Sequence, residues 1–263
     1  MSHAPSKALG QHFLVDPNIL RVIGRLAELS PEDVVLEVGP GRGVLTDYLA
    51  DRVGRVHAVE LDRALAQPLE AVVGRHPNVV LRFGDALELD LAAIEPPPTK
   101  LVSNLPYNVA TPIVVESLDG LPRIDLWCVM VQREVAERFF AQPATKAYGA
   151  VSVLVQLSTR RTGSHPVSRN AFRPRPNVDS ALVAFRRAGE RAEFPALKRL
   201  VTSSFAHRRK TLANSLELSG FAAREQAAGA LAELGLPAAA RAESLAPTDF
   251  VRLLRALAPA GDA

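Results

Sequence analysis

The sequence predicts an α/β protein whose mostly parallel sheet is covered by helices on both faces, followed by a small all-helical domain. Between about residues 34 and 131, short apolar runs typical of buried strands alternate with segments of helical period. A glycine-rich segment, residues 39–43, separates the first of these strands from the helix after it. Beyond residue 190 only helical periods remain.

The first half of the chain gives the clearest element boundaries. A leading helix is expected over residues 16–29, because Ile19 and Ile23 recur at helical spacing, Asp16 can cap the helix, and Pro17 suits its first position. The expected strands that follow are 34–38, 55–60, 79–83, 100–103 and 125–131, with helices near 44–49, 65–73 and 112–118.

After Arg133 the pattern changes. We expect helices over 134–140 and 149–157, and strands over 159–167 and 179–186 that form a pair at the edge of the sheet. Helices over 197–205, 209–218, 222–234 and 249–257 complete the chain. The expected domains are residues 1–187 and 188–263.

Composition places the chain among ordinary globular proteins, since 48% of its 263 residues are apolar and 22% are charged. One cysteine excludes a disulfide framework, and Cys128 lies in an apolar run as a core thiol would. That run is shorter than the ~18 residues of a membrane span, and residues 1–7 lack the apolar core of a signal peptide. We therefore expect a cytoplasmic protein that binds no membrane.

Positive charge is concentrated in one part of the chain. Residues 160–210 hold 13 Lys and Arg against 3 Asp and Glu, a balance of +10, whereas the whole chain carries only +3. This favours a polyanionic partner. The alternative is a solvated face on an arginine-rich protein, which has 26 Arg and 5 Lys.

The glycine-rich segment reads Glu37-Val38-Gly39-Pro40-Gly41-Arg42-Gly43. Glycines there allow a ligand to approach the backbone and leave the helix N-terminus open. The spacing departs from the dinucleotide fingerprint, which requires Ala or Gly where this chain has Val44. Taken alone, the motif also fits a turn needed only for packing.

Two carboxylates make the ligand more specific. Glu60 ends the second strand, where it can accept both hydroxyl protons of a ribose, and Asp85 follows the third strand, where it can accept from an adenine amine. A nucleoside held in this way, with no phosphate to bind, indicates S-adenosylmethionine as the cofactor rather than NAD.

The fourth strand ends in Asn104-Leu105-Pro106-Tyr107. An adenine amine is a poor nucleophile because its lone pair is delocalised into the ring. The Asn104 side-chain oxygen and the Leu105 carbonyl could accept from its N–H groups and favour the pyramidal nitrogen, while Tyr107 offers a face on which the base stacks. The residues therefore favour methyl transfer to an amine of a base.

Together these segments resemble the ribosomal RNA adenine dimethyltransferases. The resemblance runs from about Leu9 to Leu257 and rests on residues 9–16, 37–43, Glu60, Asp85 and 104–107. Residues 132–136, 148–149, 172–180 and 205–212 resemble the small-subunit (KsgA-like) branch. His12 is a departure, because the family commonly has Asn there.

The resemblance implies a Rossmann-like methyltransferase sheet that uses S-adenosylmethionine, with an RNA-binding helical domain at 188–263. The implied cofactor-binding residues are His12, Leu14, Gly39, Gly41, Glu60, Asp85 and Asn104. The implied catalytic residues are Asn104, Leu105, Tyr107 and Phe172, with Phe172 stacking on the target adenine opposite Tyr107.

The implied reaction is N6,N6-dimethylation of two adjacent adenosines in the 3′-terminal hairpin of 16S rRNA within the immature 30S subunit, performed by a monomer. No metal is expected, because the histidines show no ligand spacing. The alternatives are a large-subunit (23S) adenine methyltransferase that confers antibiotic resistance, and a non-catalytic assembly factor that retains the fold.

Overall fold

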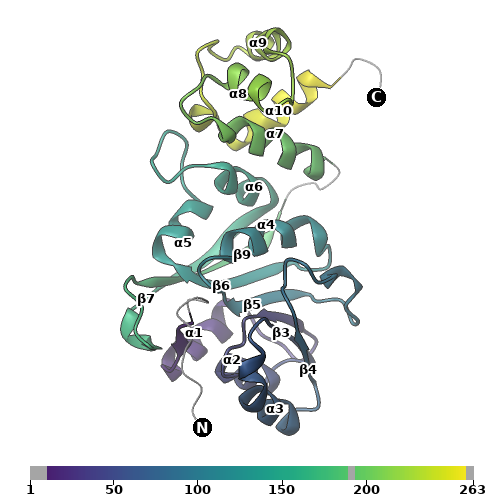
Figure 1. Cartoon of the computed structure of the whole chain (residues 1–263), viewed down its shortest axis with the longest axis vertical. Helices are drawn as coiled ribbons and strands as arrows, with labels where there is room; N and C mark the ends of the chain where they lie inside the picture. The colour runs from purple at the N-terminus through teal and green to yellow at the C-terminus, as the bar shows by residue number, and fades with distance from the viewer. Residues whose placement is uncertain (1–10, 189–192, 259–263) are drawn as a thin grey trace. The chain divides into compact units, whose positions relative to one another are not determined.

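The computed structural model describes residues 11–188 and 193–258 (Figure 1). Their contacts divide them into two compact units. Unit 1 comprises residues 11–136 and 160–187, and unit 2 comprises residues 137–159, 188 and 193–258. Residues 187 and 188 thus fall in different units, and the segment 137–159 groups with the C-terminal helices.

Unit 1 is built on a seven-stranded sheet with strand order β4-β3-β2-β5-β6-β9-β7 (Figure 1). The strands are β2 (Val34–Val38), β3 (Arg55–Glu60), β4 (Val79–Phe83), β5 (Lys100–Asn104), β6 (Leu126–Gln132), β7 (Thr159–Val167) and β9 (Ser180–Arg187). The first five strands in this order are parallel to their neighbours, whereas β9 runs antiparallel to β6. The expected strand pair at one sheet edge is confirmed.

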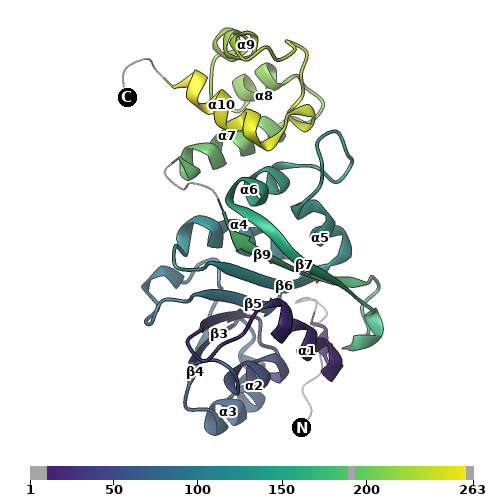
Figure 2. The same cartoon turned by 180° about the vertical axis from the view of Figure 1, so that it is seen from behind.

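Helices lie on both faces of this sheet (Figures 1 and 2). They are α1 (Pro17–Leu26), α2 (Val44–Ala50), α3 (Ala66–Arg75) and α4 (Ala110–Gly120), with short 3-10 turns η1 (Arg63–Leu65) and η2 (Leu91–Ala93). Consecutive residues of β6 show the two faces. Trp127 donates to the Ser117 hydroxyl of α4 at 2.8 Å, whereas Cys128 packs in the core cluster with Ile23 of α1.

The start of α1 follows the sequence prediction. The Asp16 side chain accepts from the Asn18 N–H at 2.8 Å, and Pro17 occupies the first helical position, where its missing N–H costs nothing. Buried Ile19 and Ile23 then face the sheet. Local sequence alone therefore explains where this helix begins and which side it buries.

A second, two-stranded sheet lies outside the sequence prediction. Strand β1 (Phe13–Leu14) pairs antiparallel with β8 (Phe172–Arg173), which follows the 3-10 turn η3 (Arg169–Ala171). Leu14 stands opposite Phe172, and the Val15 N–H donates to the Ala171 carbonyl at 2.9 Å. This pairing fixes the N-terminal segment beside the large sheet.

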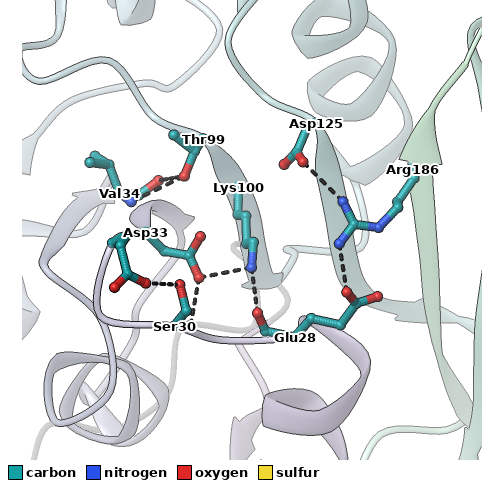
Figure 3. A network of polar contacts seen from close by, with 9 residues as sticks. Glu28, Ser30, Asp33, Val34, Thr99, Lys100, Asp125 and Arg186 are labelled. Atoms are coloured by element: carbon teal, nitrogen blue, oxygen red, sulfur yellow. Dashed lines mark hydrogen bonds and ion pairs between the residues drawn. The ribbon is translucent and has the colours of Figure 1, made fainter.

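Charged side chains form ion pairs at the amino-terminal edge of the large sheet, which is the side where the parallel strands begin (Figure 3). The Lys100 ammonium, only 7% exposed, donates to the Asp33 carboxylate at 2.8 Å and to the Glu28 carbonyl, just beyond α1. Arg186 bridges the carboxylates of Glu28 and Asp125 at 2.6 and 2.9 Å. Lys100 of β5 and Arg186 of β9 are thereby joined to residues that lie just after α1 and just before β2 and β6.

Unit 2 is helical. It contains α6 (Ala150–Ser158), α7 (Phe194–Ala206), α8 (Leu212–Leu218), α9 (Arg224–Glu233), the turn η4 (Ala242–Ser244) and α10 (Pro247–Leu257), while α5 (Arg133–Phe139) crosses the division. The buried Tyr148 explains why residues before β7 belong here, because its hydroxyl donates to the Leu245 carbonyl at 2.8 Å. Its ring packs against Phe205, which stacks on Phe250.

The all-helical tail is confirmed, with one difference at its second helix. Residues 207–210, expected near the start of that helix, form turns, and α8 begins at Leu212. None of the helices in the described ranges is both long and apolar enough to span a bilayer.

Candidate active site

A pocket opens at the carboxyl-terminal edge of the sheet in unit 1, where β2, β3, β4 and β5 end. Parallel α/β sheets bind ligands at this edge because the loops there leave backbone groups and side chains exposed. The lining residues are 11–14, 37–42, 44, 45, 59–61, 65, 84–86, 104–109 and 113. All the cofactor-binding residues expected from the sequence lie in this set, as do Leu105 and Tyr107.

The glycine loop between β2 and α2 has the backbone that only glycine adopts readily. Gly39, Gly41 and Gly43 have φ of 73°, 63° and 79°. A Cβ on Gly39 would lie 3.0 Å from the Pro106 ring, and a Cβ on Gly41 would lie 2.9 Å from the Phe13 ring. The loop is therefore pressed between the Asn104–Tyr107 turn and the N-terminal segment.

Glu60 is held by backbone groups on both carboxylate oxygens. Its Oε2 accepts from the Gly41 N–H at 3.0 Å and its Oε1 from the Asp62 N–H at 2.9 Å. Burial raises the pKa of Glu60, and those hydrogen bonds oppose the rise. Gln11 donates to Asp62 at 2.7 Å and so brings the N-terminal segment to the same corner.

Asp85 follows β4 and is half-buried. Its Oδ1 accepts from the Leu87 N–H at 2.9 Å, which orients the carboxylate at the start of the loop. Asp85 and Glu60 follow neighbouring strands, because β3 and β4 pair in parallel register with Glu60 opposite Phe83. The two carboxylates therefore lie along one edge, as expected from the sequence.

Glu37 lines the pocket, although the sequence motif that contains it predicts no role for this residue. Its side chain is 1% exposed, lines the pocket, and has one carboxylate oxygen, Oε2, with no hydrogen-bond partner among the described residues. Burial, with the nearby Glu60 charge adding to it, raises the pKa of Glu37 to about 8. A cationic group of a ligand would satisfy this oxygen. The signal in the sequence is an acidic residue two positions before the first glycine of the loop.

The Asn104 side chain is oriented by the N-terminal segment. Its Nδ2 donates to the His12 carbonyl at 3.2 Å, and a carbonyl can only accept, so Oδ1 lies on the other side of the amide. The His12 ring donates to the Pro174 carbonyl at 2.8 Å and lies 5.7 Å from the Tyr107 ring. Asn104 therefore presents an acceptor in the pocket, as the proposed amine chemistry requires.

Tyr107 is half-buried, and its hydroxyl hydrogen-bonds Ser180 Oγ at 2.7 Å, which fixes the ring. Phe172 is placed differently from the sequence expectation. Its side chain is fully buried in the core cluster that contains Leu14, and it does not line the pocket. In this structure it presents no face to a base, because pairing of β8 with β1 turns the ring into the core.

The structure assembles no group of three His, Cys, Asp or Glu side chains suited to a metal ion within residues 11–188 and 193–258. Two residues at the start of the resemblance, Leu9 and Gly10, lie outside the described residues. The pocket is thus an acidic, glycine-lined site with one oriented amide.

The family model described as "Ribosomal RNA adenine dimethylase" matches residues 3–258. The chain belongs to this family. Relatives named "Ribosomal RNA small subunit methyltransferase A" from Rubrobacter xylanophilus and Thermobifida fusca are 46% and 44% identical to it, over 97% and 95% of this chain and 96% and 89% of theirs.

Solved structures agree with the fold. A dimethyladenosine transferase from Plasmodium falciparum, 23% identical, superposes with a TM-score of 0.75 over 92% of this chain and 96% of that one, which shows the fold. The 23S rRNA methyltransferase ErmE, 30% identical, gives 0.65 over 93% and 99%. Adenine dimethylases of this family use S-adenosylmethionine as the methyl donor.

The pocket fits that cofactor on its own chemistry. S-adenosylmethionine carries a sulfonium and an ammonium, and three carboxylates line the pocket, those of Glu37, Glu60 and Asp85. Buried, unpaired Glu37 Oε2 suits a positive neighbour. A Cβ at Gly39 or Gly41 would meet the Pro106 or Phe13 ring, so the two glycines let the loop pack closely against both of these walls of the pocket.

Proposed function

We propose that this chain dimethylates N6 of two adjacent adenosines in the 3′-terminal hairpin of 16S rRNA, on the immature 30S subunit. The observation that carries the proposal is the Asn104 amide, fixed by the His12 carbonyl at the end of β5 inside an acidic pocket. The small-subunit names of the relatives at 44–46% identity support this substrate over the large subunit.

In the proposed cofactor arrangement, Glu60 accepts from the ribose hydroxyls and Asp85 from the adenine amine, with Gly39 and Gly41 beneath the sugar. His12 and Leu14 flank the methionine end. S-adenosylmethionine would supply a methyl group bound to a cationic sulfonium, whose sulfur leaves as a neutral thioether. No protein group therefore needs to activate the leaving group.

The protein's contribution to the reaction is positioning and polar stabilisation. Asn104 Oδ1 and the Leu105 carbonyl accept from the target amine, which favours the pyramidal nitrogen and the developing ammonium. The Tyr107 ring, fixed through Ser180, supports the base. Holding reactants in line is worth up to ~7–11 kcal/mol in well-oriented systems.

A stacking role for Phe172 stays a prediction that requires the ring to leave its buried site. Phe172→Leu separates the two roles, because leucine retains an apolar core side chain but has no aromatic face. If Phe172 stacks on the base, Phe172→Leu raises the RNA concentration needed for half-maximal rate about fivefold or more, consistent with ~1–3 kcal/mol per stacked base. Normal methylation at limiting RNA would assign Phe172 to the core alone.

The test of the function is tritiated methyl transfer in parallel to immature 30S subunits, 50S subunits and duplex DNA, with nucleoside analysis of the product. We expect label only on 30S, recovered as N6,N6-dimethyladenosine. Label on 50S instead would indicate the large-subunit activity. Binding of 30S without any transfer would indicate a non-catalytic assembly factor.

We also propose that the C-terminal helices, residues 188–263, contact RNA phosphates through the turn that precedes α8. His207, Arg208, Arg209 and Lys210 are all exposed there. Arg208 has local partners within unit 2, since its Nη2 lies 3.7 Å from the Glu243 carboxylate and 3.4 Å from the Tyr148 carbonyl. Arg209 and Lys210 are therefore the better phosphate ligands.

The double variant Arg209→Gln/Lys210→Gln tests this surface. The slope of log affinity for 30S against log salt should fall by about 0.7–0.9 for each phosphate that the variant no longer neutralises, while cofactor affinity stays unchanged. Arg208→Gln is the matched comparison and should mainly lower the melting temperature. An unaltered slope in the double variant would remove this turn from the RNA surface.

A further inference from the structure

The charged side chains that line the pocket are mostly acidic, and one arginine stands among them. Against the three carboxylates, Arg42 is the single Lys or Arg among the described residues that line the pocket. The cofactor assigned to this pocket has the complementary pattern, since its sulfonium and ammonium are positive and its one anionic group is the methionine carboxylate. That carboxylate requires a partner of the opposite sign.

If the cofactor binds as in the proposed function, the order of the strands indicates where its methionine carboxylate lies. Asp85 follows β4 and Glu60 ends β3, so adenine and ribose occupy that side of the edge. The strand order β4-β3-β2-β5 then places the methionine end over the loop after β2, on the way to Asn104 at the end of β5. Arg42 belongs to that loop.

Arg42 is held at this position by an aromatic contact. Its guanidinium lies 4.7 Å from the centroid of the Phe13 ring, and the same ring limits the space at Gly41. Phe13 is fixed by pairing of β1 with β8. A guanidinium carries five N–H donors, so the contact of its central carbon with the Phe13 ring is compatible with binding a carboxylate.

We propose that Arg42 binds the carboxylate of the cofactor's methionine moiety. Arg42 is exposed, so the ion pair is partly screened by solvent. The pocket thereby distinguishes the two ends of the cofactor by charge. Acidic side chains receive the nucleoside and the cationic groups, and one arginine on the glycine loop receives the carboxylate.

The test compares two ligands on two proteins by equilibrium calorimetry, with no turnover required. The ligands are S-adenosylmethionine and decarboxylated S-adenosylmethionine, which keeps the sulfonium and the ammonium but lacks the carboxylate. Arg42→Gln should weaken binding of S-adenosylmethionine about tenfold, as expected for loss of one charge-assisted hydrogen bond of ~1.4 kcal/mol. Its effect on the decarboxylated ligand should be less than about twofold.

Arg63→Gln is the matched control. The Arg63 guanidinium also lies over a phenylalanine ring, 5.5 Å from Phe83, and is exposed, but Arg63 does not line the pocket. It should leave both affinities unchanged. Arg42→Lys, which keeps the charge but not the planar group, should recover part of the preference for the carboxylate.

Each contrary result overturns the proposal in a distinct way. Equal weakening of both ligands by Arg42→Gln would mean that Arg42 only supports the loop through Phe13. Unchanged affinity for both ligands, with weaker binding of the 30S particle, would mean that Arg42 contacts RNA phosphate. If the wild-type protein binds neither ligand, the cofactor site itself is wrong, and this outcome is separable from failure of the Arg42 assignment.

Discussion

At the amino-terminal edge of the sheet in unit 1 the charged side chains pair with one another, whereas at the carboxyl-terminal edge two carboxylates are held by backbone N–H groups. Lys100 with Asp33, and Arg186 with Glu28 and Asp125, form mutual ion pairs. Glu60 and Asp85 instead accept from main-chain donors.

The difference indicates how to separate structural from functional charges. A carboxylate paired with a cation has its charge satisfied within the fold, and its removal affects stability. The Glu60 carboxylate, held by N–H groups, has no cation to satisfy its charge within the fold, and burial raises the pKa of Glu60 and of its neighbour Glu37. Substitutions at the two edges should therefore affect different quantities.

The largest expected effect is at the amino-terminal edge. Asp33→Ala leaves the Lys100 ammonium buried without its carboxylate and should lower the free energy of unfolding by about 3–5 kcal/mol. Chemical denaturation measures this. The double variant Asp33→Ala/Lys100→Met removes both charges and should recover most of the loss; equal instability of single and double variants would contradict the pairing argument.

Asn104→Ala should have the next largest effect, on rate rather than stability. Loss of one preorganised acceptor should lower the methylation rate by about 10²–10³-fold at saturating S-adenosylmethionine, with 30S binding retained. Single-turnover methyl transfer is the measurement. Asn104→Asp is a useful companion, because it keeps acceptor oxygens but loses the N–H donated to the His12 carbonyl. A normal rate for Asn104→Ala would exclude its catalytic role.

Glu37 should make the free energy of unfolding depend on pH with the sign opposite to that of a carboxylate in an ion pair. Its pKa is raised from 4.5 to about 8 in the folded protein, so the folded state binds more protons than the unfolded state between these values. Stability in the absence of cofactor should therefore fall as pH rises through this window, by up to a few kcal/mol. Glu37→Gln should flatten that fall, as denaturation at about pH 5 and about pH 8.5 would reveal.

Glu60→Ala should weaken S-adenosylmethionine binding by roughly 1.5–3 kcal/mol, since one side chain supplies the acceptors for both ribose hydroxyls. Calorimetry tests this directly. Glu70→Ala on α3 removes an exposed carboxylate from outside the pocket and serves as the control. Unchanged affinity of the Glu60 variant would place the ribose elsewhere.

The smallest expected effect is that of Arg186→Gln. Its two carboxylate partners are more than half exposed, and exposed ion pairs contribute about 0.2–1 kcal/mol each. The melting temperature should fall slightly, and less at high salt, while cofactor affinity stays unchanged. A destabilisation as large as that of Asp33→Ala would show that burial does not determine how much the ion pairs of this edge contribute to stability.

Local patterns in the sequence were sufficient for the parallel strands, the capped start of α1 and the residues that follow each strand. Pairing of β1 with β8 could not be predicted in this way, because it joins Leu14 to Phe172 across more than 150 residues and each strand has only two residues. The buried position of Phe172 is a consequence of that pairing, whereas the resemblance implied a ring that stacks on the target adenine.

The same limit applies to Tyr148 and to the amino-terminal edge. Tyr148 groups the segment 137–159 with unit 2 through a hydrogen bond to Leu245, a contact that no periodicity reveals. Lys100 reads as the polar start of a strand, and only the fold shows that its ammonium is buried. Arg42 was visible in the motif, but its contact with Phe13 depends on the placement of β1.

The reactivity of the Cys128 thiol can report how often the folded protein opens. It is the single cysteine in the chain, lies in central strand β6, and is 1% exposed. Burial raises the pKa of its thiol to about 12, and the thiolate is the species that reacts with alkylating reagents. Alkylation of the folded protein must therefore wait until the sheet exposes β6. The labelling rate, read by mass spectrometry, reports how often the sheet opens, with no engineered probe.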